Sequence, residues 1–477
     1  MSWLAAYLAV AWVIRIGMVL VILGRDLTPG ASMAWLGIIF LHPYIGGSLY
    51  LLVGETRLGP RRVQLHRQVV QKYRAIDRRR EQRSEIAVAS LPPTCQPMVM
   101  QAEKTSGMPI LWGNSAEFFD NSPAMVDRLV ADIQAAKSQV HLLYYIFYPD
   151  QTGMRIARAV IDAARRGVAC RVLADAVASR VFFHHRGLGA ELRAAGVKTA
   201  AALPVAPIQR RLPRMDLRNH RKLTVIDGAI GYVGSHNLIN PDYGGRRGNP
   251  WIDLTGRFTG PIVAELATVF EEDWAFESGE ELEVPVLPSP DAADGGIPMQ
   301  VLPTGPTAPG ESYRRVLMGA MQCARRQVIL TTPYFVPDEP SLETMMMATD
   351  RGVDVKLIVP KHPDHILTAA AGRAHFAQLL DVGVTIHQYR PGLLHTKSVT
   401  IDDAFALFGS ANLDVRSFNL NFELTTILYG PDPTAKVRDV QLSYLADSDP
   451  VDPRQWARRN IAIRYADRAV SLVSPLL

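Results

Sequence analysis

Two histidines and two lysines recur in the same pattern at two places in the chain. The stretch NHRKLTVIDGAIGYVGSHNL spans residues 219–238, and LHTKSVTIDDAFALFGSANL spans residues 394–413. Aligned without a gap, both read His-x-Lys, four further residues, Asp, and then Gly-Ser-x-Asn. The recurring residues are His220, Lys222, Asp227, Ser235 and Asn237 in the first copy, and His395, Lys397, Asp402, Ser410 and Asn412 in the second. A duplicated structural strand would not require these types to recur while the residues between them vary.

Residues of these types, in this order, have the chemistry to act on a phosphodiester. Side chains two apart on an extended strand share a face, so each copy points an imidazole and an ammonium group into one space. Ammonium groups hold anionic oxygens, one imidazole can attack phosphorus, and another can protonate the departing alkoxide. The small residues of Gly-Ser-x-Asn predict a turn where the backbone approaches a ligand. A lone histidine on a strand is more often a core or surface residue, and the repetition favours a site.

The paired motif resembles the phospholipase D superfamily, whose signature is two H-x-K-x4-D motifs in one chain. The apolar amino-terminal head, the segments LLYYIFYPDQTG, WIDLTGRFTGP and DVRSFNLNFE, and the terminal SLVSPLL resemble the bacterial cardiolipin synthase family over nearly the whole chain. The resemblance implies that one phosphatidylglycerol donates its phosphatidyl group to a histidine and releases glycerol. A second phosphatidylglycerol then accepts the group, which gives cardiolipin.

The resemblance also assigns roles to individual residues. It implies His220 as the nucleophile and His395 as the general acid and base, although the near-symmetric motifs are compatible with either histidine attacking. The lysines and asparagines, together with the serines of the same turns, are expected to hold the phosphoryl oxygens of the substrate. Asp227 and Asp402 are counted with the catalytic residues, and a structural role is as compatible with their position at the strand ends.

Two further carboxylates are expected to orient the histidines. A catalytic imidazole needs an acceptor on its other ring nitrogen, which fixes its tautomer and stabilises its charged form. Asp253 and Glu423 follow the two motifs in apolar stretches, where an unpaired carboxylate would be costly. The resemblance carries the orienting role to both. No metal or other cofactor is expected, because two lysines supply positive charge and neither half has a clustered set of metal ligands.

The amino-terminal head predicts membrane insertion. Residues 3–23 and 31–53 are apolar apart from Arg15 and His42, and each run is long enough to cross about 30 Å of hydrocarbon as a helix. A cleaved signal peptide is the alternative for the first run, but the run lacks a basic leading segment and a second apolar run follows directly. Ten Arg and Lys residues between positions 57 and 83 place that segment in the cytoplasm by the positive-inside tendency. They can also hold anionic lipid headgroups.

The remaining chain predicts a repeated α/β fold. Helix, glycine and strand alternate in each half, as in the predicted helix 122–139, with Ser122 as its N-cap, and the strand 140–148. We expect two similar phospholipase D-like α/β halves that share one active site, with helices on both sheet faces. The predicted domains are a two-helix transmembrane hairpin (1–56), a basic juxtamembrane segment and linker (57–109), and the two halves (110–289 and 290–477).

The resemblance implies a location in the bacterial inner membrane, with the catalytic domain on the cytoplasmic side, and the composition is compatible with this location. The chain has 477 residues, enough for two or three domains, and Cys95, Cys170 and Cys323 are too widely spaced to predict disulfides or a metal site. The expected partners are anionic phospholipids and the bilayer. Two other functions fit the same motifs: a phospholipase D that uses water as the acceptor, and a nuclease. Two apolar runs, and the lack of a basic stripe with interleaved aromatic residues, disfavour nucleic acid.

Overall fold

The computed structural model describes residues 3–25, 27, 29–54, 58–75, 91, 93–204, 217–243, 250–283, 295–307 and 312–472. Two compact units divide the chain. The first comprises residues 1–63 and 205–217, and the second comprises residues 64–204 and 218–477. The predicted domain boundaries near residues 56 and 290 lie outside the described residues and stay predictions.

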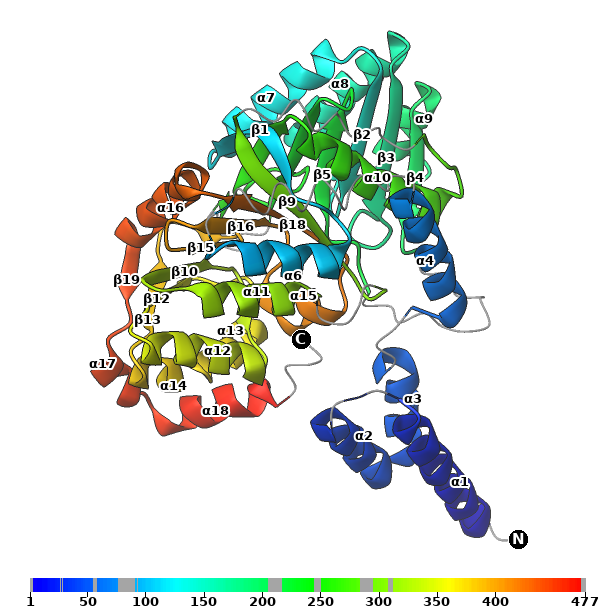
Figure 1. Cartoon of the computed structure of the whole chain (residues 1–477). Helices are drawn as coiled ribbons and strands as arrows, with labels where there is room; N and C mark the ends of the chain where they lie inside the picture. Colours follow the sequence, from blue (N-terminus) through cyan, green and yellow to red (C-terminus); the bar gives the residue numbers. More distant parts are fainter. Residues whose placement is uncertain are drawn as a thin grey trace. The chain divides into compact units, whose positions relative to one another are not determined.

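The described part of the first unit consists mainly of helices (Figure 1), and α1 and α2 are apolar. Helix α1 (Trp3–Leu23) is the one helix among the described residues that is long and apolar enough to cross a membrane. The second apolar run was expected to form one helix, but it is divided into α2 (Pro29–Leu41), α3 (Pro43–Leu49) and a π-helical turn, η1 (Tyr50–Gly54). The break lies at His42, whose φ of −136° and ψ of 80° are not helical, because the ring of Pro43 disfavours the helical conformation of the residue before it.

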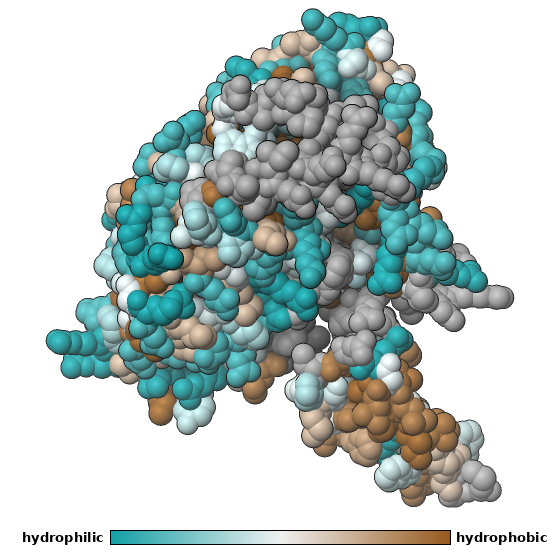
Figure 2. Space-filling view, in the orientation of Figure 1, coloured by the Kyte–Doolittle hydropathy of each residue, from teal (hydrophilic) through white to brown (hydrophobic). Residues whose placement is uncertain are grey.

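Polar contacts join α1 to the two helices that follow it. The Arg15 guanidinium donates to the carbonyl of Phe40, at 3.2 and 3.0 Å, near the end of α2. The Tyr44 hydroxyl donates to the carbonyl of Tyr7 at 2.8 Å. Most other side chains of this unit are apolar and face outward, and Figure 2 shows them over the surface of the helices. A continuous apolar surface of this kind is covered by a bilayer or a partner in a stable protein.

A sheet of 15 strands organises the second unit. From its edge inward, the first half contributes β4 (Lys198–Ala202), β3 (Ala169–Asp175), β2 (Gln139–Tyr144), β5 (Lys222–Ile226), β6 (Ile230–Gly234), β8 (Thr255–Thr259) and β1 (Leu111–Phe119). From the centre outward, the second half contributes β9 (Ile297–Thr304), β18 (Glu423–Tyr429), β16 (Phe405–Gly409), β15 (Ser398–Ile401), β10 (Gln327–Thr331), β12 (Asp354–Pro360), β13 (Thr385–Tyr389) and β19 (Ser448–Pro450). Apart from β19 the two halves have the same strand order, and β1 and β9 join them in antiparallel pairing.

Helices cover both faces of this sheet (Figure 1). Along β2, Val140 and Leu142 pack toward one set of helices, whereas Leu143 packs toward another, as expected for a strand buried on both faces. One set is α7 (Ser122–Ala135), α8 (Gln151–Arg165) and α9 (Leu188–Ala194) in the first half, and α11 (Ser312–Cys323), α12 (Glu339–Asp350) and α14 (Phe376–Asp381) in the second. The other is α10 (Ile262–Ser278) and α16 (Pro431–Ala446). The α/β prediction, with helices on both faces, is confirmed.

Shorter elements complete the second unit. Two pairs of short strands lie outside the large sheet: β11 (Phe335–Val336) with β17 (Leu413–Asp414), and β7 (Trp251–Ile252) with β14 (Leu393–Leu394). Among the described residues, the remaining helices are α13 (Ile366–Arg373), α15 (Val415–Asn419), α17 (Pro453–Ala457) and α18 (Ile461–Ser471). The pair β7 and β14 joins the first half to the second immediately before His395.

Three local predictions were inaccurate. Asn121, and not Ser122, is the N-cap of α7, since its side chain accepts a hydrogen bond from Ala124 N at 3.1 Å. The strand predicted over 140–148 ends at Tyr144. The predicted linker contains a helix, α6 (Gln96–Ser106), because Met98, Val99 and Ala102 share one helical face and are buried in the core against α11.

Helix α4 (Pro60–Ala75) ties the juxtamembrane segment to the second unit. From Gln64 onward this helix belongs to that unit. The Arg74 guanidinium forms two hydrogen bonds to the Glu272 carboxylate of α10, at 2.7 and 2.9 Å. Because Glu272 is almost fully buried, this pair fixes the end of α4 on the fold.

Candidate active site

Each motif histidine lies directly before a motif strand, and its backbone is held by the opposite half of the chain. His220 N donates to the carbonyl of Phe422 at 2.9 Å, and His395 N donates to the carbonyl of Ile252 at 2.8 Å. Phe422 belongs to the second half and Ile252 to the first. The two motifs therefore begin at the seam where the halves meet.

The side chains of the two histidines are also held across this seam. His220 Nδ1 lies 3.0 and 2.9 Å from the two oxygens of Glu423, and His395 Nδ1 lies 2.6 Å from Asp253 Oδ1. The carboxylate that follows each motif thus contacts the histidine of the other motif. A hydrogen bond from Nδ1 to a carboxylate leaves Nε2 of the neutral ring with a free lone pair.

The motif serines hold these carboxylates. Ser235 Oγ donates to Asp253 Oδ1 at 2.6 Å, and Ser410 Oγ donates to Glu423 Oε2 at 2.6 Å. Both hydroxyls thus help to position a carboxylate that contacts a histidine, and the expected role of the serines in substrate binding stays a prediction. The preceding glycine makes this possible: a Cβ on Gly234 would lie 2.4 Å from the carbonyl oxygen of Leu254.

The two motif asparagines differ in what they contact. Asn237 Oδ1 accepts a hydrogen bond from Ile146 N at 3.2 Å, so its carbonyl oxygen holds a loop of the protein. Asn412 is 4% exposed, and its Oδ1 has no hydrogen-bond partner among the described residues. A buried acceptor without a partner is costly. Asn412 is thus the asparagine that is available to a substrate hydroxyl.

Both motif lysines are buried beside the histidines. Lys222 Nζ donates to the carbonyl of His220 at 2.7 Å, and Lys397 Nζ donates to the carbonyl of His395 at 2.5 Å. Burial lowers the pKa of Lys222 to about 7, although Glu423 and Asp253 oppose the change. Burial also lowers the pKa of Lys397 well below its ordinary value, and the charge of Lys222 adds to the effect. The positive charge of Lys222 thus disfavours the protonated form of Lys397.

The histidines experience the same environment. Burial lowers the pKa of His220 to about 4 against the opposing charge of Glu423, and it lowers the pKa of His395 to about 3 against that of Asp253. Lys397 contributes to the shift of His220, and Lys222 contributes to that of His395. Four basic groups thus gather around two carboxylates. A bound anion would supply the negative charge that favours their protonated forms.

The two motif aspartates lie at the other ends of their strands. Asp227 has a φ of 54° and accepts hydrogen bonds from the backbone N–H groups of Lys137, Ser138 and Gln139, at 2.7 to 2.9 Å. Asp402, with a φ of 51°, holds the backbone N–H groups of residues 325–327 in the same way. The structure does not bring these carboxylates to the imidazoles. These contacts favour the structural role that their position at the strand ends also allows, and their expected place among the catalytic residues stays a prediction.

Replacing Asp227 by alanine is expected to lower stability more than activity. The change removes the acceptor for three backbone donors at the start of β2, a loss of about 1–3 kcal/mol, and we expect a thermal midpoint lower by about 2–4 °C. Near-ultraviolet circular dichroism of the purified chain measures it. The exposed Asp381 gives a matched control, because Asp381→Ala removes the same group from the surface. Full stability together with abolished turnover in Asp227→Ala would instead favour a catalytic role.

Several positioning residues were missed by the sequence interpretation. The Asp175 carboxylate accepts from Asn219 N at 3.1 Å, and Asp273 accepts from Asn219 Nδ2 at 2.9 Å and from Arg221 at 2.6 Å. Arg221 Nε in turn donates to the carbonyl of Glu423 at 3.0 Å. The sequence did contain a signal for these residues. Asp175 is an acidic residue at the end of strand β3, and Asp273 lies in the largely buried helix α10.

Aromatic rings flank the two imidazoles. The ring centroid of Tyr145 lies 4.9 Å from that of His220, and the centroid of Trp251 lies 4.3 Å from that of His395. Ser417 and Asn421 add hydrogen bonds to Glu423, at 3.0 and 3.3 Å. Across the described ranges, no three His, Cys, Asp or Glu side chains are grouped so that they could share a metal ion.

Comparison with known proteins places this geometry in a family. A family model described as "Cardiolipin synthase, PLD-like domain" matches residues 129–274 and again residues 317–442. The two matches contain the two motifs. Cardiolipin synthase A of Edwardsiella ictaluri is 35% identical over 484 aligned residues, which cover 100% of this chain and 98% of that protein. Cardiolipin synthase A of Yersinia pestis has the same identity and coverage.

A solved structure has the same fold at low sequence identity. The phosphatidylserine synthase of Haemophilus influenzae matches with a TM-score of 0.61 and 16% identity, over 80% of this chain and 99% of that one. The full-length relatives are more specific, because they also cover the apolar head. From the repeated family match and the full-length identity, the chain belongs to the cardiolipin synthase family of phosphatidyltransferases with phospholipase D-like domains.

Proposed function

We propose that the two halves form one active site, which transfers a phosphatidyl group between two phosphatidylglycerol molecules and yields cardiolipin and glycerol. The observation that carries this proposal is the crossed pairing, in which Glu423 contacts His220 and Asp253 contacts His395. Neither histidine keeps its orienting carboxylate without the other half. The buried lysines give this site the positive charge that an anionic phosphodiester requires.

The first step forms a covalent intermediate. His220 Nε2 attacks phosphorus, the bond from phosphorus to the glycerol oxygen breaks, and His395 gives its proton to that oxygen. Burial keeps the pKa of His395 low. The phosphodiester anion raises this pKa, so substrate binding favours the protonated form of His395, which is the form that acts as the general acid. Lys222 and Lys397 hold the non-bridging oxygens as negative charge develops on them.

The second step returns the enzyme to its starting state. His395 takes the proton from a hydroxyl of the second phosphatidylglycerol, whose oxygen attacks phosphorus, and the bond from phosphorus to His220 breaks. The assignment of His220 as the nucleophile follows from family resemblance. It is supported by exposure, since 12% of the His220 side chain is accessible, against 3% of the His395 side chain.

The products distinguish transfer from hydrolysis. The purified full-length chain in neutral detergent, given phosphatidylglycerol alone, should release one glycerol for each cardiolipin formed. Water as the acceptor would instead give phosphatidic acid with no cardiolipin, and this result would favour the phospholipase D alternative. Cleavage of a plasmid by the same preparation would favour a nuclease.

We further propose that the head is a two-helix hairpin in the bacterial cytoplasmic membrane, with the second unit on the cytoplasmic side. The length of α1, the contact between Arg15 and Phe40 and the arginine-rich segment after the head support this proposal. The break at His42 is compatible with a membrane helix whose freed backbone groups find partners.

Cysteine labelling tests this topology. In spheroplasts, a membrane-impermeant maleimide should label Gly30→Cys, which lies in the first turn of α2 with open space around its Cβ. The reagent should label the exposed Lys104→Cys only after the membrane is permeabilised. The unmodified chain, with its three native cysteines in the second unit, is the control. The reverse pattern would place the second unit outside the cell.

A further inference from the structure

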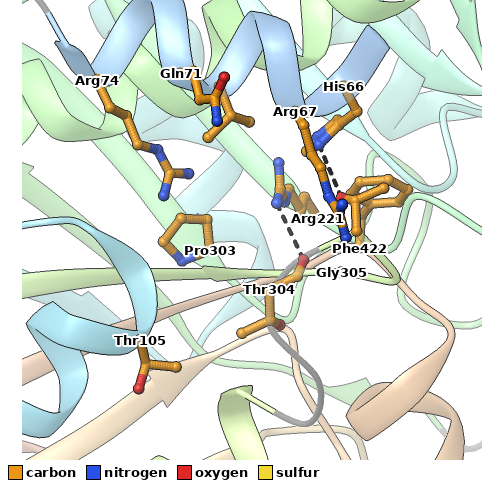
Figure 3. A pocket seen from close by; sticks show the side chains of 12 residues that line it. His66, Arg67, Gln71, Arg74, Thr105, Arg221, Pro303, Thr304, Gly305 and Phe422 are labelled. Atoms are coloured by element: carbon orange, nitrogen blue, oxygen red, sulfur yellow. Dashed lines mark hydrogen bonds between the residues drawn. The ribbon is translucent and has the colours of Figure 1, made fainter. Parts of the chain in front are cut away.

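A cavity of about 420 Å³ lies between α4 and the end of β9, within the second unit (Figure 3). Arg67, Val70 and Gln71 face it from α4, and Pro303 and Thr304 face it from β9. Phe422 closes it next to the motif segment. No step of the proposed transfer uses this cavity.

The cavity has one positive charge that no acidic residue in the described part of the chain neutralises. Three guanidinium groups line it. Arg74 is paired with Glu272, and Arg221 is paired with Asp273 at 2.6 Å. Arg67 is exposed and forms no ion pair with a described residue, and its side chain reaches from α4 toward Gly305 (Figure 3). An anion can therefore bind there without displacing an existing carboxylate.

The other lining groups indicate what this anion carries. Thr304 is 4% exposed, and its Oγ1 has no hydrogen-bond partner among the described residues. Val70, Pro303 and Phe422 add apolar surface. One cation, one unpaired hydroxyl and an apolar wall suit a phosphate ester attached to an apolar chain. We propose that this cavity binds the phosphate and glycerol backbone of one anionic phospholipid, which is not consumed in the reaction.

The position of α4 in the sequence favours a membrane lipid over free phosphate. The helix begins at Pro60, six residues after the end of the apolar head at Gly54, and it contains five Arg and Lys residues and no Asp or Glu. A basic helix next to a membrane segment attracts anionic lipids. Anionic lipids attracted to α4 are therefore concentrated next to the cavity, which can bind one of them.

The bound lipid would act on the first histidine. The carbonyl of Phe422 holds His220 N, and Arg221 holds the carbonyl of Glu423. Both Phe422 and Arg221 line the cavity. A lipid bound there would therefore restrict the motion of the residues that orient His220. We therefore expect a bound lipid to increase turnover. This effect rests on the proposed function, whereas binding does not.

Photo-crosslinking tests the site in the full-length chain in neutral detergent. The probe is a phosphatidylglycerol with a diazirine next to its glycerol backbone, and peptide mapping locates the adduct. We expect adducts on residues 64–75 and 303–307, also when His220 and His395 are both replaced by alanine. Adducts confined to the two motif segments would overturn the site. Loss of labelling with equimolar inorganic phosphate would make it a phosphate site instead.

Variants separate the cavity from general attraction to the helix. Arg67→Gln should reduce the cavity adduct about tenfold, and Thr304→Val, which keeps the backbone contacts, should reduce it severalfold. Arg61→Gln is the matched control, because it removes the same charge from α4 outside the cavity and should leave the adduct unchanged. Equal losses in Arg61→Gln and Arg67→Gln would contradict a defined site. If Arg67→Gln lost the cavity adduct but kept wild-type turnover, the lipid would bind the cavity without affecting turnover, and only the proposed effect on turnover would be overturned.

Discussion

Replacing either His220 or His395 by alanine is expected to lower turnover on the order of 10⁴-fold, and replacing both should lower it scarcely further. Residues that act as one unit are strongly non-additive, because the site fails as soon as one member is lost. Initial rates of cardiolipin formation by purified variants measure the effect. The exposed His184 gives the control, since His184→Ala removes an imidazole outside the site and should retain full activity.

The same experiment separates one shared site from two independent ones. If each half worked alone, either single variant would retain about half of the activity, and only the double variant would be inactive. Half activity in His220→Ala or His395→Ala would therefore contradict the shared site, whatever product is formed.

The second large effect is expected from the orienting carboxylates. Glu423→Gln and Asp253→Asn keep the size of each side chain but remove its charge, so the imidazole loses the acceptor that fixes its tautomer. A loss of about 10²–10⁴-fold is expected in each case. Glu343→Gln, on the surface of α12, is the matched control.

The pattern of these losses tests the crossed pairing. Glu423 contacts His220, so Glu423→Gln should impair formation of the phosphatidyl-enzyme. Asp253 contacts His395, so Asp253→Asn should impair protonation of the leaving group and be rescued by a substrate with a good leaving group. If this substrate rescued Glu423→Gln and not Asp253→Asn, each acid would serve the histidine of its own half.

The sequence predicted which residue types form the site better than it predicted which of them contact one another. The spacing of His220 and Lys222 alone placed both side chains on one side of the chain, and the burial of Asp253 and Glu423 was predicted from their apolar neighbours. Which acid contacts which histidine depends on how β1 and β9 join the halves. No local pattern contains this information, because the paired residues are far apart in the sequence. Asp253 and His395 are separated by 142 positions, and His220 and Glu423 by 203.

Local ambiguity limited the other assignments made from the sequence. A small residue in a turn can contact a ligand or the protein itself, and Ser235 does the latter. Asp227 follows the motif strand with a positive φ, and its three backbone donors come from residues about 90 positions away, so the sequence left its structural and catalytic roles equally open. The break before Pro43 is different, because proline chemistry predicts it from the sequence alone.

Trapping the covalent intermediate tests the central claim most directly. His395→Ala lacks the general acid, so a phosphatidyl ester of a nitrophenol, whose leaving group needs no proton, should still be attacked. Acid quenching followed by peptide mass mapping should find the phosphatidyl group on His220 in this variant and on no residue of His220→Ala. A phosphatidyl group on His395 in His220→Ala would reverse the roles of the two histidines, and no adduct in either variant would contradict the covalent mechanism.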